Sequence, residues 1–146
     1  MSALRSVEDA LAQVLASASP LRDTVTTALP RALGHYLAED VTSPIAVPAE
    51  DNSAMDGYAL RAADARGPLP VSQRIPAGSV GAPLEPGTAA RIFTGAPVPT
   101  GADAVVMQEN CREADGVVTV EGEVEAGQNI RPRGQDIAVG ATVLTR

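Results

Sequence analysis

The sequence predicts a mainly β protein with a few short helices. Short apolar runs separated by turn residues fill the chain after residue 48, and 12 of the 13 glycines lie from Gly57 onward. Clear helical periodicity is confined to one segment near the N-terminus. The interior has to be built from Ala, Val, Leu and Ile, because the chain has no Trp, two Tyr and one Phe.

Residues 6–18 are predicted to form the clearest helix. Ser6 is the expected N-cap, Glu8 and Asp9 follow near the positive end of the helix dipole, and Pro20 lies just past the end. One apolar stripe is too small to fold alone, so the helix docks either on a core of the same domain or on a domain absent from this chain. The side chains of the stripe are Val7, Ala10, Leu11, Val14, Leu15 and Ala18.

Residues 24–47 predict a strand, a short helical turn and a second strand. Val25–Leu29 is β-prone, Pro30 can open a turn that ends at Gly34, and Leu37–Val41 leads out as the second strand.

The chain after residue 48 predicts a compact β domain made of short strands with turn residues between them. The expected strands are Tyr58–Leu60, Leu69–Ile75, Ala89–Phe93, Ala104–Met107, Val117–Val120 and, near the end, Ala141–Thr145.

Charge and composition exclude several classes of protein. The net charge of -7 argues against generic nucleic-acid binding and against an anionic membrane surface. All basic residues are Arg, and the lack of Lys excludes a P-loop NTPase and a lysine Schiff base. A single cysteine, Cys111, excludes an internal disulfide and multi-Cys zinc sites and fits a reducing cytoplasm. Cys111 and the lone His35 are interpreted as an incidental thiol and a surface or packing residue. The first ten residues have no apolar run typical of a signal peptide or membrane span.

Three polar segments are candidates for chemistry. The first is PAEDNSAMDGYA at residues 48–59, in which Asp56-Gly57 is a turn signal because Gly takes positive φ freely. It is either a solvated turn or a loop that presents Asp56 to a ligand or a metal.

The second segment is RIFTGAPVPTGADAVV at residues 91–106. A strand is expected to end at Thr94-Gly95, before a stiff Pro-x-Pro loop. Glycine at a strand end lets backbone N–H groups approach an anion, and the Thr94 hydroxyl can add a hydrogen bond. The alternative is a stiff connection between strands.

The third segment is GQNIRPRGQDI at residues 127–137. Arg131 or Arg133 could bind a phosphate or carboxylate with its planar fork of donors. Alternatively, one of these arginines pairs with Asp136 across a turn. Carboxylates such as these could hold Mg²⁺, although this ion usually needs substrate phosphates as further ligands.

In this order the three segments resemble the signatures of the molybdopterin molybdenumtransferase family, which includes MoeA and the gephyrin E domain. DNSAMDGYA at residues 51–59 is similar to the signature that opens its second domain. RIFTGAPVP at residues 91–99 and GADAVVMQE at 101–109 are similar to the second signature, and GQNIR…GQDI…G at 127–140 to the third. The resemblance extends from the N-terminal helix to Arg146.

The resemblance implies a β-rich inserted domain plus part of an elongated α+β first domain. Residues 1–44 would be the N-terminal helix and a first-domain segment, 45–130 the all-β second domain, and 131–146 the return segment of the first domain. An α/β domain that holds the pterin, and a fourth domain, would follow Arg146.

The resemblance also implies an activity. Family members are homodimers that use Mg²⁺ and insert molybdenum from molybdate into adenylylated molybdopterin, with release of AMP. Their active site is a cleft between the second domain of one subunit and the third domain of the other. No cofactor is expected to be needed for this chain to fold.

By the matching motifs, Asp56, Thr94 and Asp136 are the predicted catalytic residues on this side of the cleft. Asp56 and Asp136 would help to position Mg²⁺ or the molybdate chemistry, and Thr94 would hydrogen-bond ligand oxygens. Weaker substrate-binding candidates are Ser53, Gly95 and Arg131. The chain departs from the family at Glu50, where an aromatic residue is usual, and this puts the packing of the loop base in question.

Two hypotheses therefore stand. The chain is one wall of an enzyme's active site, or it is an isolated dimerisation and interaction module without catalysis. Residues 1–146 alone are predicted not to insert molybdenum under either hypothesis.

Overall fold

The computed structural model describes residues 5–19 and 23–146. Contacts divide the chain into two compact units, Met1–Glu39 with Arg146, and Asp40–Thr145. The division into residues 1–44, 45–130 and 131–146 stays a prediction, because two contact units cannot test a three-part assignment. The fold is mainly β with one α-helix and three short 3-10 helices in the described ranges, which confirms the predicted class.

Helix α1 spans Val7–Ser17, as the periodicity predicts. The Ser6 side chain accepts a hydrogen bond of 3.1 Å from the Asp9 backbone N–H, so the predicted cap is present. Helix α1 buries none of its side chains. The predicted stop at Pro20 lies outside the described residues.

Residues 24–41 differ from the prediction. No strand forms over Val25–Leu29 or Leu37–Asp40, because neither stretch has a partner strand among the described residues to satisfy its backbone. Pro30 does open a helical turn, the 3-10 helix η1 at Leu29–Arg31, and Gly34 follows with φ of 87°.

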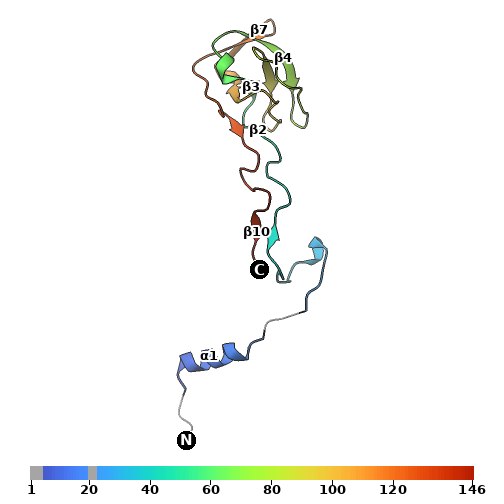
Figure 1. Cartoon of the computed structure of the whole chain (residues 1–146), viewed down its shortest axis with the longest axis vertical. Coiled ribbons are helices and arrows are strands. Elements are labelled where there is room, and N and C mark those ends of the chain that lie inside the picture. Colours follow the sequence, from blue (N-terminus) through green and yellow to red (C-terminus); the bar gives the residue numbers. More distant parts are fainter. Residues whose placement is uncertain (1–4, 20–22) are drawn as a thin grey trace. The chain divides into compact units, whose positions relative to one another are not determined.

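A two-segment ladder joins the start and end of the second unit, and Figure 1 shows the two segments side by side. Strand β1, Val41–Thr42, pairs antiparallel with β10, Thr142–Leu144. Farther along, β2, Asn52–Ser53, pairs with β9, Ile130–Arg131. The β-rich domain is therefore inserted between the two segments, as the resemblance implied.

The main sheet has the strand order β6-β3-β5-β4-β8-β7, in which only β4 and β5 run parallel. The expected apolar runs form strands at nearly the predicted bounds. Two 3-10 helices, η2 at Ala62–Asp64 and η3 at Gln108–Asn110, and one further strand, β7 at Cys111–Ala114, complete the domain. The strands of the predicted runs are β3 Gly57–Leu60, β4 Leu69–Ile75, β5 Ala89–Ile92, β6 Ala104–Met107 and β8 Val117–Val120.

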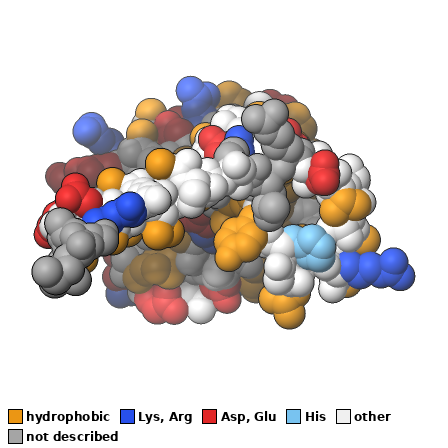
Figure 2. Space-filling model, turned by 90° about the horizontal axis from the view of Figure 1, so that it is seen from below, with side chains coloured by type: hydrophobic (Ala, Val, Ile, Leu, Met, Phe, Trp, Pro, Cys, Tyr) orange, Lys and Arg blue, Asp and Glu red, His pale blue; other side chains and the backbone are white. Residues whose placement is uncertain are grey.

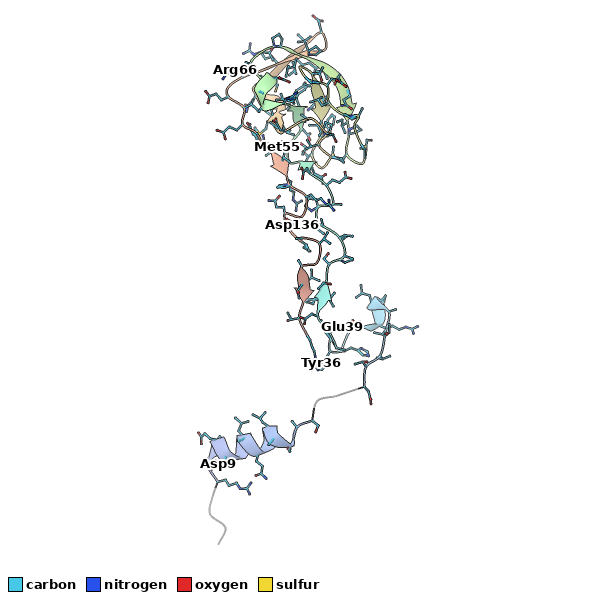
Figure 3. All side chains as sticks on the ribbon, viewed as in Figure 1. Asp9, Tyr36, Glu39, Met55, Arg66 and Asp136 are labelled. Carbon is cyan, nitrogen blue, oxygen red and sulfur yellow. The ribbon has the colours of Figure 1, made fainter. Side chains whose placement is uncertain are left out.

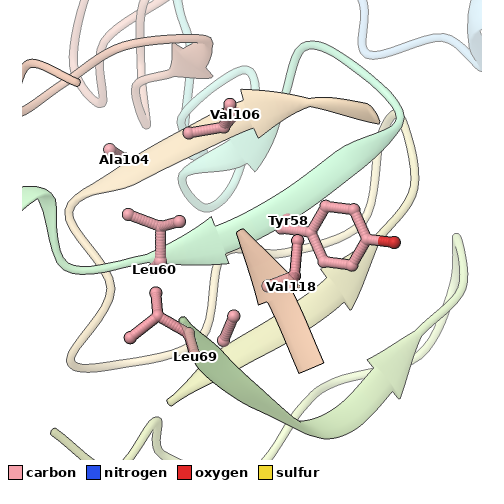
Figure 4. Close-up of a cluster of buried hydrophobic side chains, with 7 residues drawn as sticks. Tyr58, Leu60, Leu69, Ala104, Val106 and Val118 are labelled. Carbon is pink, nitrogen blue, oxygen red and sulfur yellow. The ribbon is translucent and has the colours of Figure 1, made fainter. Parts of the chain in front are cut away.

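Both faces of the central strands are buried, because alternate residues enter two different apolar clusters. In β3, Tyr58 and Leu60 belong to the cluster drawn in Figure 4, whereas Ala59 belongs to the other. Small side chains at Ala59 and its neighbours in β5 allow the layers to pack closely without a large aromatic core.

Gly57 has a different role from the predicted one. It is absent from the positive-φ glycines and begins β3. A Cβ at this position would lie 1.9 Å from the carbonyl oxygen of Val106, so glycine is needed here for close strand approach rather than for a turn.

Candidate functional site

The three candidate segments converge where the ladder meets the sheet. The first runs from β2 to β3, the second follows β5, and the third contains β9. Backbone bonds tie the first two together: Gly95 N–H donates to the Ser53 carbonyl at 2.8 Å, and Ser53 N–H donates to the Ala96 carbonyl at 2.9 Å. The pairing of β2 with β9 adds the third segment.

Asp56 and Thr94 form a direct pair, although 38 residues separate them in sequence. Carboxylate oxygen Oδ1 of Asp56 accepts the Thr94 backbone N–H at 2.8 Å and the Thr94 hydroxyl at 2.7 Å. The other oxygen, Oδ2, makes no hydrogen bond or ion pair to any described residue, and both residues are exposed. The structure thus presents one carboxylate oxygen to solvent and uses the other to hold the loop.

The surroundings of Asp56 favour its ionised form. The Thr94 backbone N–H lowers the pKa of the Asp56 carboxyl most, and the Thr94 hydroxyl lowers it further. Desolvation opposes this shift, and the positive charge of Arg91 adds to it. A carboxylate with a lowered pKa is a weak general base near neutral pH, so Asp56 is better suited to bind a cation or accept a hydrogen bond.

The Thr94 hydroxyl donates its proton to Asp56 in this arrangement. A hydroxyl has one proton and two lone pairs, so it can accept from a ligand as it stands but must leave Asp56 to donate to a ligand oxygen.

Ser53 and Gly95 hold the loops in place. The Ser53 side chain is 2% exposed, donates to the Met55 carbonyl at 2.6 Å and accepts the Met55 N–H at 3.3 Å. Gly95 has φ of 81°, a conformation that side chains rarely adopt. The Ser53 hydroxyl is buried and bonded within the loop. The contacts of Ser53 and Gly95 with substrate stay predictions.

Arg131 and Asp136 form an ion pair across the turn after β9, through Nη2 and Oδ2. This is the alternative that the sequence left open for an arginine of the third segment. Both side chains are about half exposed, at 49% and 42%, so the pair is open to solvent.

The Arg131–Asp136 pair and the Asp56–Thr94 pair are separate. No hydrogen bond or ion pair between described residues joins them. In Figure 3, Asp136 lies on the ladder, whereas Met55, the neighbour of Asp56, lies at its junction with the β domain.

A magnesium ion would find few protein ligands here. In the parts of the chain that the structure describes, no group of three or more His, Cys, Asp or Glu side chains could hold a metal. Mg²⁺ is often bound by one or two carboxylates together with substrate phosphates, and the free oxygen of Asp56 fits that pattern as one ligand.

Sequence reasoning missed Arg91 and Gln108, which contact the segment that carries Asp56. Arg91 donates to the Gly57 carbonyl at 2.8 Å and to the Gln108 side chain at 2.5 Å. Gln108 N–H in turn donates to the Asp56 carbonyl at 3.0 Å. The available signal was the strand alternation that places Arg91 and Phe93 on one face directly before Thr94.

A hollow of about 920 Å³ lies beside these loops without including the predicted catalytic residues. Glu50 lines it and is exposed, so the acidic side chain at this unusual position carries no cost of burial. Asp51 also lines it and accepts the Arg133 backbone N–H at 2.7 Å, which fixes the loop base.

Cys111 and His35 agree with their predicted roles. Burial is the main cause that raises the pKa of the half-buried Cys111 thiol to about 11, so the thiol stays protonated and weakly reactive at neutral pH. His35 is exposed. Among the described residues, no helix is both long and apolar enough to span a membrane.

Fold and site together define a β domain inserted into a two-segment ladder, with polar loops gathered at the junction. The chain belongs to the family described as the MoeA N-terminal region (domain I and II), whose family model matches residues 5–146.

Individual relatives agree with this assignment. The chain is 41% identical over 152 residues to molybdopterin molybdenumtransferase 2 of Mycobacterium tuberculosis H37Rv, which covers 97% of this chain and 36% of the relative. It is 43% identical over 123 residues to the molybdopterin molybdenumtransferase of Haemophilus influenzae KW20 Rd, which covers 80% and 30%. The crystal structure of the molybdopterin biosynthesis moeA protein from Pyrococcus horikoshii OT3 superposes with a TM-score of 0.85 at 34% identity, over 95% of this chain and 39% of that one. The chain thus spans about a third of the length of the relatives it matches.

Proposed function

We propose that this chain forms part of an enzyme that inserts molybdenum from molybdate into adenylylated molybdopterin and releases AMP. The relatives named molybdopterin molybdenumtransferase support this activity, and their greater length supports a missing C-terminal pterin-binding domain. The chain would supply one wall of an active site between subunits of a homodimer in the cytoplasm.

The single observation that carries the proposal is the Asp56–Thr94 pair. Two segments far apart in the sequence place an ionised carboxylate at an exposed junction, with one oxygen saturated by Thr94 and the other without a partner in the described structure. A carboxylate held in one orientation is suited to act on a bound, charged substrate because it needs little reorganisation.

We assign the roles of the residues from the resemblance together with this geometry. Asp56 would bind Mg²⁺ through Oδ2, and the ion would neutralise phosphate charge of the substrate. Thr94 orients Asp56, and its oxygen lone pairs can accept a hydrogen bond from the substrate. Asp136, with Arg131 as its partner, would contribute a second carboxylate or a second Mg²⁺ contact from the ladder, and Ser53 and Gly95 would shape the loop that meets the substrate.

The test is the replacement Asp56→Asn after this segment is grafted onto a complete family homologue. We expect the rate of molybdenum insertion to fall by about a hundredfold, because the amide cannot supply the negative charge. The matched control is Asp115→Asn, which changes an exposed carboxylate in a turn of the same domain. Unchanged insertion in the Asp56→Asn protein would remove Asp56 from the mechanism.

The isolated chain is expected to be inactive. It would supply only one wall of the active site and depends on a pterin-binding surface that the resemblance places after Arg146. Purified residues 1–146 should therefore produce no molybdenum cofactor from adenylylated molybdopterin and molybdate, and measurable synthesis would contradict this.

A second candidate function is a dimerisation and interaction module without catalysis. The observation that favours it is the exposure of apolar side chains over residues 25–37, where Leu29, Leu33 and Tyr36 are 87%, 95% and 95% exposed. Figure 2 shows hydrophobic side chains on the surface seen from below. Sedimentation of residues 1–146 tests this: a strictly monomeric chain would argue against a dimer contact in the first-domain segments.

A further inference from the structure

Arg91 lies on a strand of the main sheet, three residues before Thr94. It lies in β5, directly opposite Tyr58 of β3. Its guanidinium carbon is 5.2 Å from the centre of the Tyr58 ring and 4.5 Å from the centre of the Phe93 ring. These are cation–π distances, so two aromatic rings hold the side chain in one orientation.

The same guanidinium reaches the backbone on both sides of the pair. Nη1 donates to the carbonyl of Gly57, the residue after Asp56, at 2.8 Å. It also lies 3.3 Å from the carbonyl of Ile92, two residues before Thr94. Its contact with Phe93 fixes the residue immediately before Thr94. One side chain therefore touches the flanks of both loops that have to meet.

Gln108 closes the network from a third segment. Its side-chain oxygen accepts Nη2 of Arg91 at 2.5 Å, and its backbone N–H donates to the Asp56 carbonyl at 3.0 Å. Asp56 is thus held through its backbone by Gln108 and through its side chain by Thr94.

Arg91 makes no ion pair with a carboxylate among the described residues. Its donors are directed to carbonyl and amide oxygens instead, and its faces to aromatic rings. A planar guanidinium can make these contacts at once, whereas the compact ammonium of Lys cannot. The geometry therefore depends on the shape of the side chain as well as on its charge.

Arg74 provides an internal comparison. It is the register partner of Arg91 on β4, and its guanidinium carbon is also 4.5 Å from the centre of the Phe93 ring. Unlike Arg91, it makes no hydrogen bond or ion pair to a described residue of either loop. The two arginines share the ring contact and differ in the contacts that reach Gly57 and Gln108.

We propose that Arg91 is a positioning residue that, together with Gln108, holds the loops before β3 and after β5 so that Asp56 and Thr94 meet with one carboxylate oxygen left free. Its importance for catalysis rests on the proposed function, whereas its effect on the pair does not.

The first test measures the pair itself in residues 1–146 by ¹H–¹⁵N NMR. We expect Arg91→Met to move the Thr94 amide resonance upfield, as its bond to the Asp56 carboxylate weakens, and to speed its hydrogen exchange about tenfold. Arg74→Met loses a ring contact of the same length and should leave both readouts unchanged. Arg91→Lys should behave like Arg91→Met, because charge alone does not restore the contacts.

Two results would overturn the proposal: an unmoved Thr94 amide in Arg91→Met, or full restoration by Arg91→Lys. If Arg91→Met fails to fold, Gln108→Met removes one acceptor and leaves both aromatic contacts of Arg91. It should shift the Thr94 resonance in the same direction by a smaller amount, and an unmoved resonance in this variant also overturns the proposal.

The second test uses the grafted, complete homologue. We expect Arg91→Met to lower kcat by about ten- to a hundredfold with little change in KM. A small misplacement of Asp56 affects the reacting geometry more than it affects substrate binding. Arg74→Met should retain the parent kcat. A rise in KM with an unchanged kcat would contradict a positioning role. Because the NMR result does not depend on molybdenum chemistry, failure of the proposed function and failure of this inference can be told apart.

Discussion

The two compact units of the chain differ in whether they bury their apolar side chains. Within residues 40–145, Leu60, Ile92 and Val105 are fully buried and belong to clusters on both faces of one sheet. Within residues 5–19 and 23–39 no side chain is buried, and Leu33 and Tyr36 are each 95% exposed.

This difference separates local structure from stability. Helix α1 has a cap, acidic residues in its first turn and an apolar stripe, so its sequence encodes the helix well. An isolated helix of 11 residues is nevertheless marginal in water, because most helical stability comes from packing an apolar face. The N-terminal unit has the local signals of a folded segment without a core of its own, whereas the second unit has both.

Removing a leucine side chain from each unit tests whether the two units contribute differently to the free energy of unfolding. Leu60→Ala should lower the free energy of unfolding by about 2–5 kcal/mol, because it leaves a cavity in the cluster of Figure 4. Leu11→Ala, at a leucine that is 56% exposed, should change it by less than about 0.5 kcal/mol. Urea unfolding followed by circular dichroism measures both, and equal losses would show that the N-terminal unit has a core after all.

The β domain was predictable because its strands carry local signals. The runs at Leu69–Ile75 and Ala104–Met107 form strands at the predicted bounds. The missed strand β7 is polar and exposed at one edge of the sheet, so hydrophobicity could not reveal it. A turn signal was present, however: Asp115 and Gly116 have φ of 52° and 75° and join β7 to β8, as expected for a type I′ hairpin turn.

A second Asp-Gly pair shows the limit of such signals. Asp56-Gly57 has the same composition, yet Gly57 lies within a strand and allows the Val106 backbone to approach. A short motif can indicate that glycine is required, but it does not distinguish a turn from a close approach of two strands. The expected strand at Val25–Leu29 failed for a related reason, since β propensity cannot supply a missing partner strand.

The contacts among the predicted site residues could be predicted only in part. The resemblance selected Asp56 and Thr94, and the structure shows them in contact. Neither residue type nor spacing indicated that Thr94 would donate to Asp56, because that contact depends on the pairing of β3 with β5. Arg91 was overlooked for the same reason: its partners come from three segments that only the folded sheet brings together.

A smaller effect distinguishes the buried tyrosine of the second unit from the exposed one of the first. Burial, followed by the hydrogen bond to Glu113, raises the pKa of Tyr58 from the ordinary 10.0 to about 12. Because the folded-state pKa is the higher one, the resulting stability is complete below pH 10 and is lost as the pH rises through 12.

Tyr58→Phe should therefore cost about 1 kcal/mol at neutral pH, where the hydrogen bond to Glu113 is lost. The difference in the free energy of unfolding between Tyr58→Phe and the parent chain should shrink as the pH rises above 10. Urea midpoints at several pH values measure this. Tyr36→Phe, which alters a ring that is 95% exposed, is the control and should follow the parent curve. A constant difference across the alkaline range would refute the linkage.

The smallest expected effect comes from the largest change, the removal of residues 1–39. Since no described residue of this unit is buried, a chain that starts at Asp40 should unfold within about 0.5 kcal/mol of the parent and retain its amide exchange protection in β3 and β5. A large loss would mean that the unit stabilises the sheet through contacts that burial does not reveal. If the loss is absent, the exposed apolar side chains of the described residues 7–19 and 23–37 have no role in the stability of residues 40–145. Their exposure would then have to be explained by surfaces outside this chain, and the same truncation in a complete homologue should weaken the proposed homodimer while leaving the Asp56–Thr94 pair intact.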